Sequence, residues 1–391
     1  MPDLPAIASL DVATTVPCRY RVHFGRGLLD PGQPLLADVL AAAPEPPPQG
    51  CLAVLDAGLV AAQPGLPGRI TAYFAAHAGR VRLLEPPLVL PGGEAAKNSL
   101  LIPRRLIRLA RRDRLSRHGH IVAVGGGAFL DAVGFAAALI HRGVRLVRLP
   151  TTTLAQNDAG IGVKNGLNLD GLKNFLGTFA VPAAVLNDFD FLDTLADRDW
   201  RAGIAEAFKV AAIRDAAFLD WLVTAAPALR NRDAAAMETL IRRCAALHLA
   251  QIAGAGDPFE SGLARPLDFG HWAAHKLESL SGQQLNHGEA VAIGMALDLR
   301  YAAATGLIPE AEAERVIRAL GAAGLPAWHE AAGRRDAAGR PQLFDGIEEF
   351  REHLGGRLHI TLPAPLGRGV EIHAMDEAVL ERCLGRRAPS A

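Results

Sequence analysis

The chain has 391 residues, of which 50% are hydrophobic and 21% are charged, so its composition predicts a globular protein rather than a disordered one. Lysine plus arginine and aspartate plus glutamate each number 41, which gives a formal net charge of zero. A balanced charge argues against binding to nucleic acid or to a membrane surface, because both need an excess of basic groups.

The spacing of the cysteines and the first residues of the sequence predict the cellular compartment. The four cysteines are at least 33 residues apart, so we expect neither a disulfide framework nor a cysteine zinc site. The first residues lack the basic and apolar segments of a signal peptide, and no apolar run is long enough to span a membrane. We therefore expect a cytoplasmic protein.

Short apolar runs alternate with helical patterns in the first half of the chain. The runs cover residues 51–55, 120–124, 144–149 and 183–186, and the helical patterns include 100–111 and 130–140. This alternation predicts a parallel sheet built from βαβ units.

The second half is instead rich in alanine and leucine. Helical patterns cover residues 202–213, 216–224, 234–253, 270–280 and 288–305, and one strand pattern covers 358–362. We predict an α/β, Rossmann-like nucleotide-binding domain at residues 1–195, followed by an all-α domain that binds metal and substrate at residues 196–391.

Two glycine-rich turns are candidates for a phosphate-binding loop. Gly125, Gly126 and Gly127 follow a predicted strand and precede a helix that carries Asp131, so their amides would face a negative charge. A plain tight turn explains this pattern equally well, and the motif is not GxGxxG. The second turn, PGGE with Glu94 and Lys97, is by itself more typical of a helix start.

Polar groups are dense after the third predicted strand. They favour a site for a polyhydroxylated or phosphorylated ligand over a solvated loop, because each buried hydroxyl needs a partner and the lysines and asparagine lie among glycines. The residues are Thr151, Thr152, Asp158, Lys164, Lys173 and Asn174.

A third cluster has the composition of a metal site. His271 and His275 are four residues apart and share a helix face, and His287 opens the next helical segment. Glu206 lies on an earlier helix, with Lys209 one turn further along. One carboxylate and two imidazoles with an open fourth position are typical of catalytic zinc, but spacing alone does not decide which residues bind.

Together these segments resemble the 3-dehydroquinate synthase family, also called the sugar phosphate cyclases. The resemblance extends from about Asp56 to Met295 and rests on GGGAFLDAVGFAAALIHRG, LPTTTLAQNDAGIGVKNGLN, LKNFLGTF, GIAEAFK, DFGHWAAHKLE and NHGEAVAIGM. Within the family, the sequence is most similar to the dehydroquinate-synthase-like proteins of bacterial ebo gene clusters.

The resemblance implies a role for each group of residues. NAD would be bound by Asp56, Glu94, Lys97, Gly125, Gly126, Gly127, Asp131, Thr151, Thr152 and Lys173. Zinc or cobalt would be bound by Glu206, His271 and His287. The catalytic groups would be Asp158, Lys164, Lys209 and His275. Substrate would be bound by Arg142, Asn174, Asp268 and Arg351, and Arg142 would come from the partner subunit of a homodimer.

Four positions depart from the pattern of true 3-dehydroquinate synthases. Ala250 and Ala264 stand where those enzymes have a lysine and an arginine that clasp the substrate carboxylate. Asp268 replaces an asparagine, as in sedoheptulose 7-phosphate cyclases, and Arg351 is the nearest cation to a missing C-terminal lysine pair. A carboxylate buried without cationic partners would be several kcal/mol less stable, which disfavours the usual seven-carbon acid.

The resemblance therefore implies an NAD- and zinc-dependent cyclase, a carbon–oxygen lyase acting on a small sugar phosphate similar to sedoheptulose 7-phosphate. In the family reaction NAD removes a hydride, phosphate leaves by elimination, the hydride returns and the opened sugar closes by an aldol step. If His248 or Arg265 replaces the missing cations, the chain is a 3-dehydroquinate synthase proper. The motifs also leave open a polyol dehydrogenase of the glycerol dehydrogenase type and an inactive scaffold.

Overall fold

The first part of the fold is a seven-stranded sheet, seen in a computed structural model that describes residues 9–14, 17–42, 44–170, 172–254, 267–353 and 356–386. The strands run in the order β1-β9-β6-β5-β2-β3, β4 also pairs with β2, and every pairing is parallel. Their bounds are Arg21–Gly25 (β1), Gln49–Asp56 (β2), Val81–Leu83 (β3), Leu88–Leu90 (β4), His120–Gly125 (β5), Arg145–Pro150 (β6) and Ala184–Asp188 (β9).

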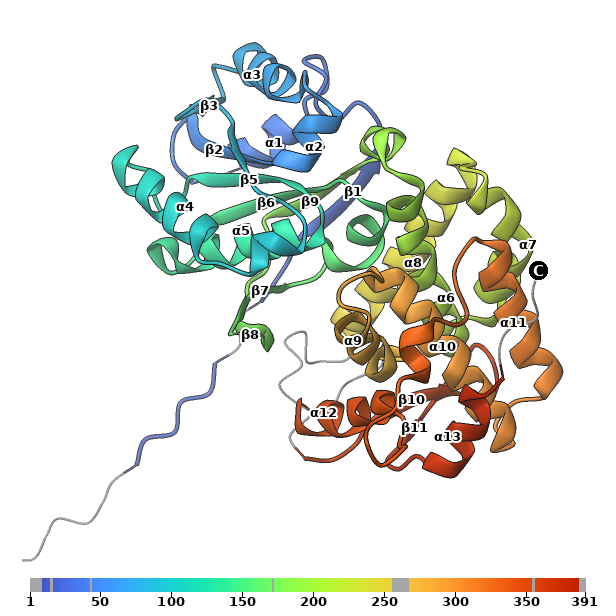
Figure 1. Cartoon of the computed structure of the whole chain (residues 1–391). Coiled ribbons are helices and arrows are strands. Elements are labelled where there is room, and N and C mark those ends of the chain that lie inside the picture. The colour runs from blue at the N-terminus through green and yellow to red at the C-terminus, as the bar shows by residue number, and fades with distance from the viewer. Residues whose placement is uncertain are drawn as a thin grey trace, which may run out of the picture.

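Helices cover both faces of this sheet (Figure 1). Side chains alternate along β2, so that Cys51 and Ala53 pack toward one set of helices while Leu52 and Val54 pack toward the other. The first set is α1 (Leu35–Ala41), α2 (Ala57–Ala62) and α3 (Leu66–Ala76), and the second is α4 (Leu101–Arg112) and α5 (Gly127–Leu139). Burial on both faces explains why the strands read as continuous apolar runs.

The second part is helical and shares one apolar core. Helix α10 lies in its middle with α6, α9, α11 and α13 packed around it, which explains its alanine- and glycine-rich sequence (Figure 1). The bounds are Asp197–Arg214 (α6), Ala216–Arg230 (α7), Ala234–Gly254 (α8), His271–Leu280 (α9), His287–Ala304 (α10), Glu310–Ala322 (α11), Asp345–His353 (α12) and Glu377–Leu384 (α13).

Two antiparallel hairpins complete the fold. One joins β7 (Lys164–Leu169) to β8 (Leu172–Phe179), and the other joins β10 (Ile360–Pro363) to β11 (Gly369–Ile372). The sequence predicted a polar loop rather than the first hairpin, because glycine and polar residues interrupt its alternation and Phe175 and Phe179 are exposed. The second hairpin contains β10, which overlaps the one strand pattern that the sequence predicted in the second half, at residues 358–362.

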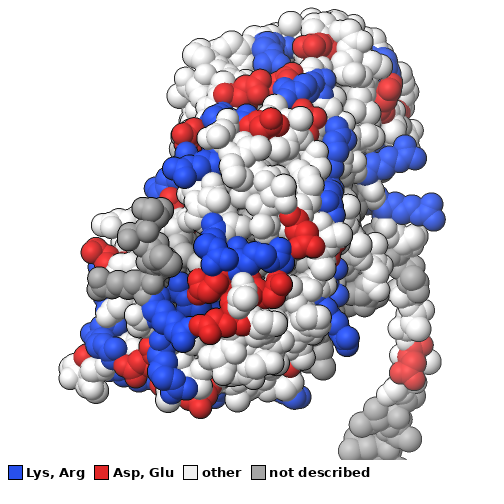
Figure 2. All heavy atoms as spheres, turned by 90° about the vertical axis from the view of Figure 1, so that its right-hand side faces the viewer, with Lys and Arg blue, Asp and Glu red and all other residues white. Residues whose placement is uncertain are grey.

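The predicted order of an α/β part followed by a helical part is confirmed, and the division at residue 195 stays a prediction. Within the described ranges, no helix combines the length and the apolar character needed to cross a bilayer. On the face shown in Figure 2, basic side chains lie beside acidic ones, in keeping with the zero net charge.

Candidate functional site

The carboxyl ends of three neighbouring strands place the first group of predicted residues together. Asp56 ends β2, Gly125 ends β5, and Thr151 directly follows β6. The register pairs Leu55 with Val124 and Gly125 with Pro150, so these ends lie side by side. Ligands of open α/β sheets bind at this edge.

The glycines at this edge are required by close packing. A Cβ atom on Gly92 would lie 2.0 Å from Oδ1 of Asp56, and one on Gly125 would lie 2.9 Å from the Cβ of the same residue. Asp56 itself accepts a 2.8 Å hydrogen bond from the amide of Gly58 and begins α2. Glycine at these two positions makes room for the Asp56 side chain, and α5 begins at Gly127 with its N-terminal amides at the same edge.

Lys97 joins two other predicted residues, Asp131 and Asn174. Its Nζ lies 2.8 Å from Oδ2 of Asp131 and also donates to Oδ1 of Asn174, and the lysine is only 7% exposed. Burial raises the pKa of Asp131, and the charge of Lys97 opposes this shift. Glu94 lies in the same short 3₁₀ helix, Glu94–Lys97.

The threonines after β6 shape the backbone that carries Asp158. The amide of Thr151 donates to the carbonyl of Gly125 over 3.1 Å, and Oγ1 of Thr152 accepts from the amide of Ala155 over 3.1 Å. A π-helical turn, Ala155–Ala159, then presents Asp158 toward α6 and α8. Such turns are frequent at functional sites.

The predicted metal residues come together from three helices. One ligand atom from each of Glu206 (α6), His271 (α9) and His287 (α10) lies within 4.8 Å of the other two. Oε1 of Glu206 is 3.4 Å from Nε2 of His287 and 3.9 Å from Nε2 of His271. Both histidines begin their helices, so short connections rather than helix interiors set their positions.

Two glycines allow these helices to approach closely. A Cβ on Gly288 would lie 2.4 Å from the carbonyl oxygen of Ala202 on α6. Gly270 has a φ of 78°, and its carbonyl carbon and oxygen contact Gly294 of α10. Each glycine is adjacent to one of the two histidines, which explains glycine at these positions.

The electrostatics of this cluster are set by buried opposite charges. Burial would raise the pKa of Glu206, but Lys209, His287 and His271 lower it well below its usual range. Burial would lower the pKa of Lys209, but Glu206 and Asp158 raise it. Glu206 is fully buried, Lys209 contacts its Oε2, and its Oε1 faces the two imidazole nitrogens, which suits a metal ligand.

Glu278 belongs to the site and was missed. Its Oε1 lies 3.4 Å from Nδ1 of His287, and its Oε2 accepts a 2.7 Å hydrogen bond from Lys173. The structure thus places Lys173 beside the metal cluster, whereas the sequence predicted it at the cofactor. A signal was present, because Glu278 follows His271 by seven residues and shares its helix face.

Arg148 was also missed. It is fully buried in β6 and donates to the carbonyls of Gly160, Gly162 and Lys164 over 3.2, 2.7 and 3.1 Å. Burial lowers the pKa of Arg148, with Asp131 opposing the shift. An arginine inside a predicted buried strand was the available signal, and its role is to fix the segment between Asp158 and Lys164.

His248 of α8 lies next to Asp158. Its Nε2 is 3.2 Å from Oδ1 of Asp158, and the imidazole is 5% exposed. Ala250, two residues later, is exposed. Ala264 and Arg265 lie outside the described residues.

The remaining predicted residues divide into two groups. The ring of His275 lies 5.6 Å from that of His271, and the carbonyl of Asp268 accepts a 2.9 Å hydrogen bond from the His271 amide, so both border the metal cluster. Lys164 is exposed at the start of β7. Arg351 pairs with Glu348 over 3.2 Å on α12, which packs on α9.

Arg142 lies at the opposite end of α5 from the glycine turn of its own chain. It is exposed just after α5, whose 13 residues separate it from the glycine turn by about 20 Å. Its φ of 63° is left-handed, which fixes a tight turn there.

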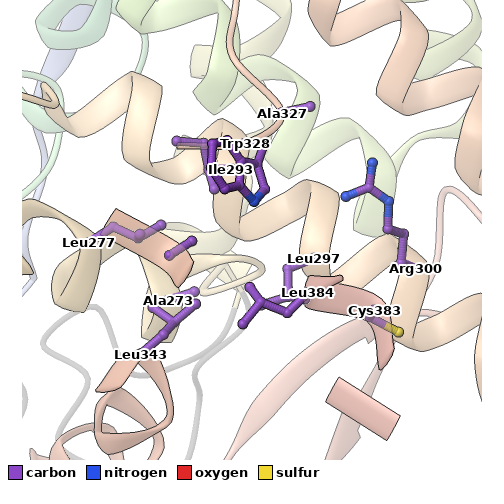
Figure 3. Close-up of a pocket in the computed structure, with 11 residues that line it drawn as sticks. Ala273, Leu277, Ile293, Leu297, Arg300, Ala327, Trp328, Leu343, Cys383 and Leu384 are labelled. Atoms are coloured by element: carbon purple, nitrogen blue, oxygen red, sulfur yellow. The ribbon is translucent and has the colours of Figure 1, made fainter. Parts of the chain in front are cut away.

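A hollow is lined in part by residues of α9, α10 and α13 (Figure 3). None of the metal-cluster residues lines it. Its lining is apolar apart from groups such as Arg300 and Cys383, and none of the described residues around it is a carboxylate or an imidazole. This hollow therefore lacks the groups that distinguish the metal cluster.

The fold joins a parallel α/β part to a helical part, and the helical part carries a cluster of two imidazoles and a carboxylate that could hold a metal ion. Family models match the chain twice, as 3-dehydroquinate synthase N-terminal at residues 87–202 and 3-dehydroquinate synthase C-terminal at residues 203–340. The chain is 37% identical over 303 residues to the 3-dehydroquinate synthase of Paracoccus denitrificans, covering 77% of this chain and 81% of the relative. It belongs to the 3-dehydroquinate synthase family.

Solved structures extend this likeness. ValA, a 2-epi-5-epi-valiolone synthase from Streptomyces hygroscopicus with NAD+ and Zn2+ bound, matches with a TM-score of 0.84 and 31% identity over 96% of this chain and 98% of that one. A 2-deoxy-scyllo-inosose synthase complexed with carbaglucose-6-phosphate, NAD+ and Co2+ shares the fold, with a TM-score of 0.74 and 22% identity over 93% and 95% of the two chains. The family resemblance is confirmed, while the likeness to ebo-cluster proteins stays a prediction.

Proposed function

We propose that the chain is an NAD- and zinc-dependent sugar phosphate cyclase that closes a ketose phosphate into a carbocycle with elimination of phosphate. The observation that carries this proposal is the convergence of Glu206, His271 and His287 beside the buried cation of Lys209. ValA, with NAD+ and Zn2+ bound, supports the choice of cofactors.

The residues present fit both groups. Oε1 of Glu206 is buried without a hydrogen bond of good geometry, and the Nε2 atoms of His271 and His287 face it, as a zinc site requires. The amides at the start of α5 and the open space beside Gly93 suit the phosphates of a dinucleotide at the strand ends. When bound, zinc polarises substrate oxygens and NAD accepts and returns a hydride.

The chain's own groups then have distinct tasks. Lys209 stays protonated, since its pKa is raised, and it stabilises an oxyanion that forms next to Glu206. Asp158 lies 3.9 Å from Lys209 and orients it, while Lys164 enters from β7 to contact the substrate. Asn174, His275, Asp268 and Arg351 hold the substrate and its phosphate. Arg142 reaches the phosphate from the second subunit of a homodimer, because it lies far from this site in its own chain.

The substrate follows from a missing cation. Position 250 is alanine, so a carboxylated substrate would lack the lysine that 3-dehydroquinate synthases supply there. We therefore favour a neutral ketose phosphate similar to sedoheptulose 7-phosphate. His248, whose Nε2 lies 3.2 Å from Asp158, is the specific observation that keeps 3-dehydroquinate synthase activity as the second candidate.

Purified protein with NAD and zinc would be incubated separately with sedoheptulose 7-phosphate and with 3-deoxy-arabino-heptulosonate 7-phosphate. Phosphate release and product mass are the measurements, and Glu206→Gln is the inactive control. We expect turnover of the first substrate alone. Turnover of the second would establish 3-dehydroquinate synthase activity instead, and net NADH formation from glycerol would indicate a polyol dehydrogenase.

A further inference from the structure

A second group of metal-ligand side chains lies on the β10–β11 hairpin, outside the site described above. The ladder pairs Ile360 with Ile372 and Thr361 with Glu371. Continuing this register by one residue places His359 opposite His373. Because side chains alternate along a strand, Glu371 and His373 share one face of the hairpin, and His359 belongs to that face.

The three side chains meet at one point. Nδ1 of His359 lies 2.9 Å from Oε1 of Glu371, and Nε2 of His373 lies 3.6 Å from the same oxygen. All three ligand atoms lie within 4.8 Å of one another. Zinc bonds of about 2.0–2.1 Å in a tetrahedral site place ligand atoms about 3.4 Å apart, so small side-chain rotations complete the geometry.

A backbone carbonyl fixes the orientation of the His373 ring. Its Nδ1 lies 2.9 Å from the carbonyl oxygen of Leu358. A carbonyl only accepts, so Nδ1 donates to it, which leaves Nε2 as the ring nitrogen that faces Glu371. This arrangement of a backbone carbonyl behind an imidazole is the one that orients metal-bound histidines.

His359 is the most buried of the three residues. Its side chain is 6% exposed, compared with 37% for Glu371 and 39% for His373. Its Nδ1 faces the Glu371 carboxylate away from solvent, so the protein shields one side of a cation bound there from water.

We propose that His359, Glu371 and His373 bind a zinc-class divalent cation, separate from the Glu206 site, with water completing the coordination. Two imidazoles and one carboxylate favour zinc over the hard cations Mg²⁺ and Ca²⁺. The ion ties the two strands of the hairpin together. Because the amide of Gly367 donates to the carbonyl of Ala212 over 2.7 Å, the same ion braces α6, the helix that carries Glu206.

The test counts metal in tag-free protein that has been loaded with zinc and passed through gel filtration. We expect about two zinc ions per chain in the unmodified protein, and about one in each of Glu206→Gln, Glu371→Gln and His373→Ala. Val370→Ala, on the other face of β11, is the matched control and should keep both ions. Retention of both ions by Glu371→Gln and His373→Ala, or loss of all zinc from Glu206→Gln, would overturn the proposal.

Cobalt provides a readout that does not depend on turnover. Glu206→Gln loaded with Co²⁺ should show visible absorption from the hairpin site, and this band should be absent when His373→Ala is added. Zinc should raise the Tm of Glu206→Gln but not that of the double variant, which circular dichroism would verify as folded. A chain that holds a zinc ion sensitive only to His373→Ala would support this site while contradicting the proposed function, so the two failures are distinguishable.

Discussion

Glu278 and Glu206 face opposite nitrogens of the His287 ring. Oε1 of Glu278 lies 3.4 Å from Nδ1, and Oε1 of Glu206 lies 3.4 Å from Nε2. Burial would lower the pKa of His287, but the two carboxylates raise it to about 10. Burial would raise the pKa of Glu278, but His287 and Lys173 lower it to about 2. Glu278 therefore stays ionised and holds the proton on Nδ1, and a metal bound beside Glu206 would displace the second proton, the one on Nε2.

Replacing Glu278 by glutamine should weaken zinc binding. A neutral amide accepts from Nδ1 more weakly than a carboxylate and does not raise the basicity of His287, and losses at such positions are about 10- to 100-fold in metal affinity. Competition with a chromophoric chelator would measure the affinity. Glu330→Gln, at an exposed position, is the control. Equal affinities of Glu278→Gln and the unmodified protein would contradict this role.

Gly288→Ala should destabilise the protein and weaken zinc binding together. The new Cβ would lie 2.4 Å from the carbonyl oxygen of Ala202, which forces α10 and α6 apart at a loss of about 1–3 kcal/mol. Gly321→Ala in α11 has open space around it and should stabilise by up to about 1 kcal/mol. Urea unfolding of the two variants would measure the difference, and similar stabilities would contradict the packing argument.

Asp298 should make stability depend on pH. Burial raises its pKa to about 7, and it accepts hydrogen bonds from Trp272 and Gly270 over 2.9 and 3.0 Å. Between the unfolded pKa of about 3.9 and the folded value, the native state binds the extra proton, so stability falls as pH rises, by at most about 1.4 kcal/mol per pH unit.

Unfolding of the unmodified protein and Asp298→Asn at pH values from 4 to 8 would test this dependence. The stability advantage of the unmodified protein should shrink as pH rises through that window and then level off above the folded pKa. Gly321→Ala, which changes no titratable group, is the control and should show a constant difference. A constant difference for Asp298→Asn as well would show that this carboxyl does not titrate as described.

Arg142 and Glu206 should complement each other across subunits if the proposed function and homodimer hold. Arg142→Ala and Glu206→Gln homodimers are each expected to be inactive. Subunits exchanged at random form heterodimers in half of the dimers, with one complete site each, so about a quarter of full activity should return. Phosphate release after mixing is the measurement. No recovery despite proven subunit exchange would place Arg142 in the site of its own chain.

The sequence was sufficient where one local pattern determined an element. The apolar runs predicted β2, β5, β6 and β9 to within a few residues, and the motif order predicted the residues that meet at Lys97 and at Glu206. Glu278 and Arg148 were missed because their contacts cross between elements that local periodicity does not relate. The hairpin face of His359 was missed because the strand Gly369–Ile372 is too short to show alternation.

The hairpin β7–β8 connects the residues at the strand ends to the metal cluster. Asn174 accepts from Lys97 beside the strand ends, and its chain neighbour Lys173 pairs with Glu278, the carboxylate behind His287. A ligand that immobilises Asn174 also restricts Lys173, and the reverse holds. The second ligand to bind therefore causes a smaller loss of conformational entropy. The dinucleotide and the metal are expected to raise each other's affinity by the same factor, as thermodynamic linkage requires. Removal of either one should therefore increase the dissociation constant of the other.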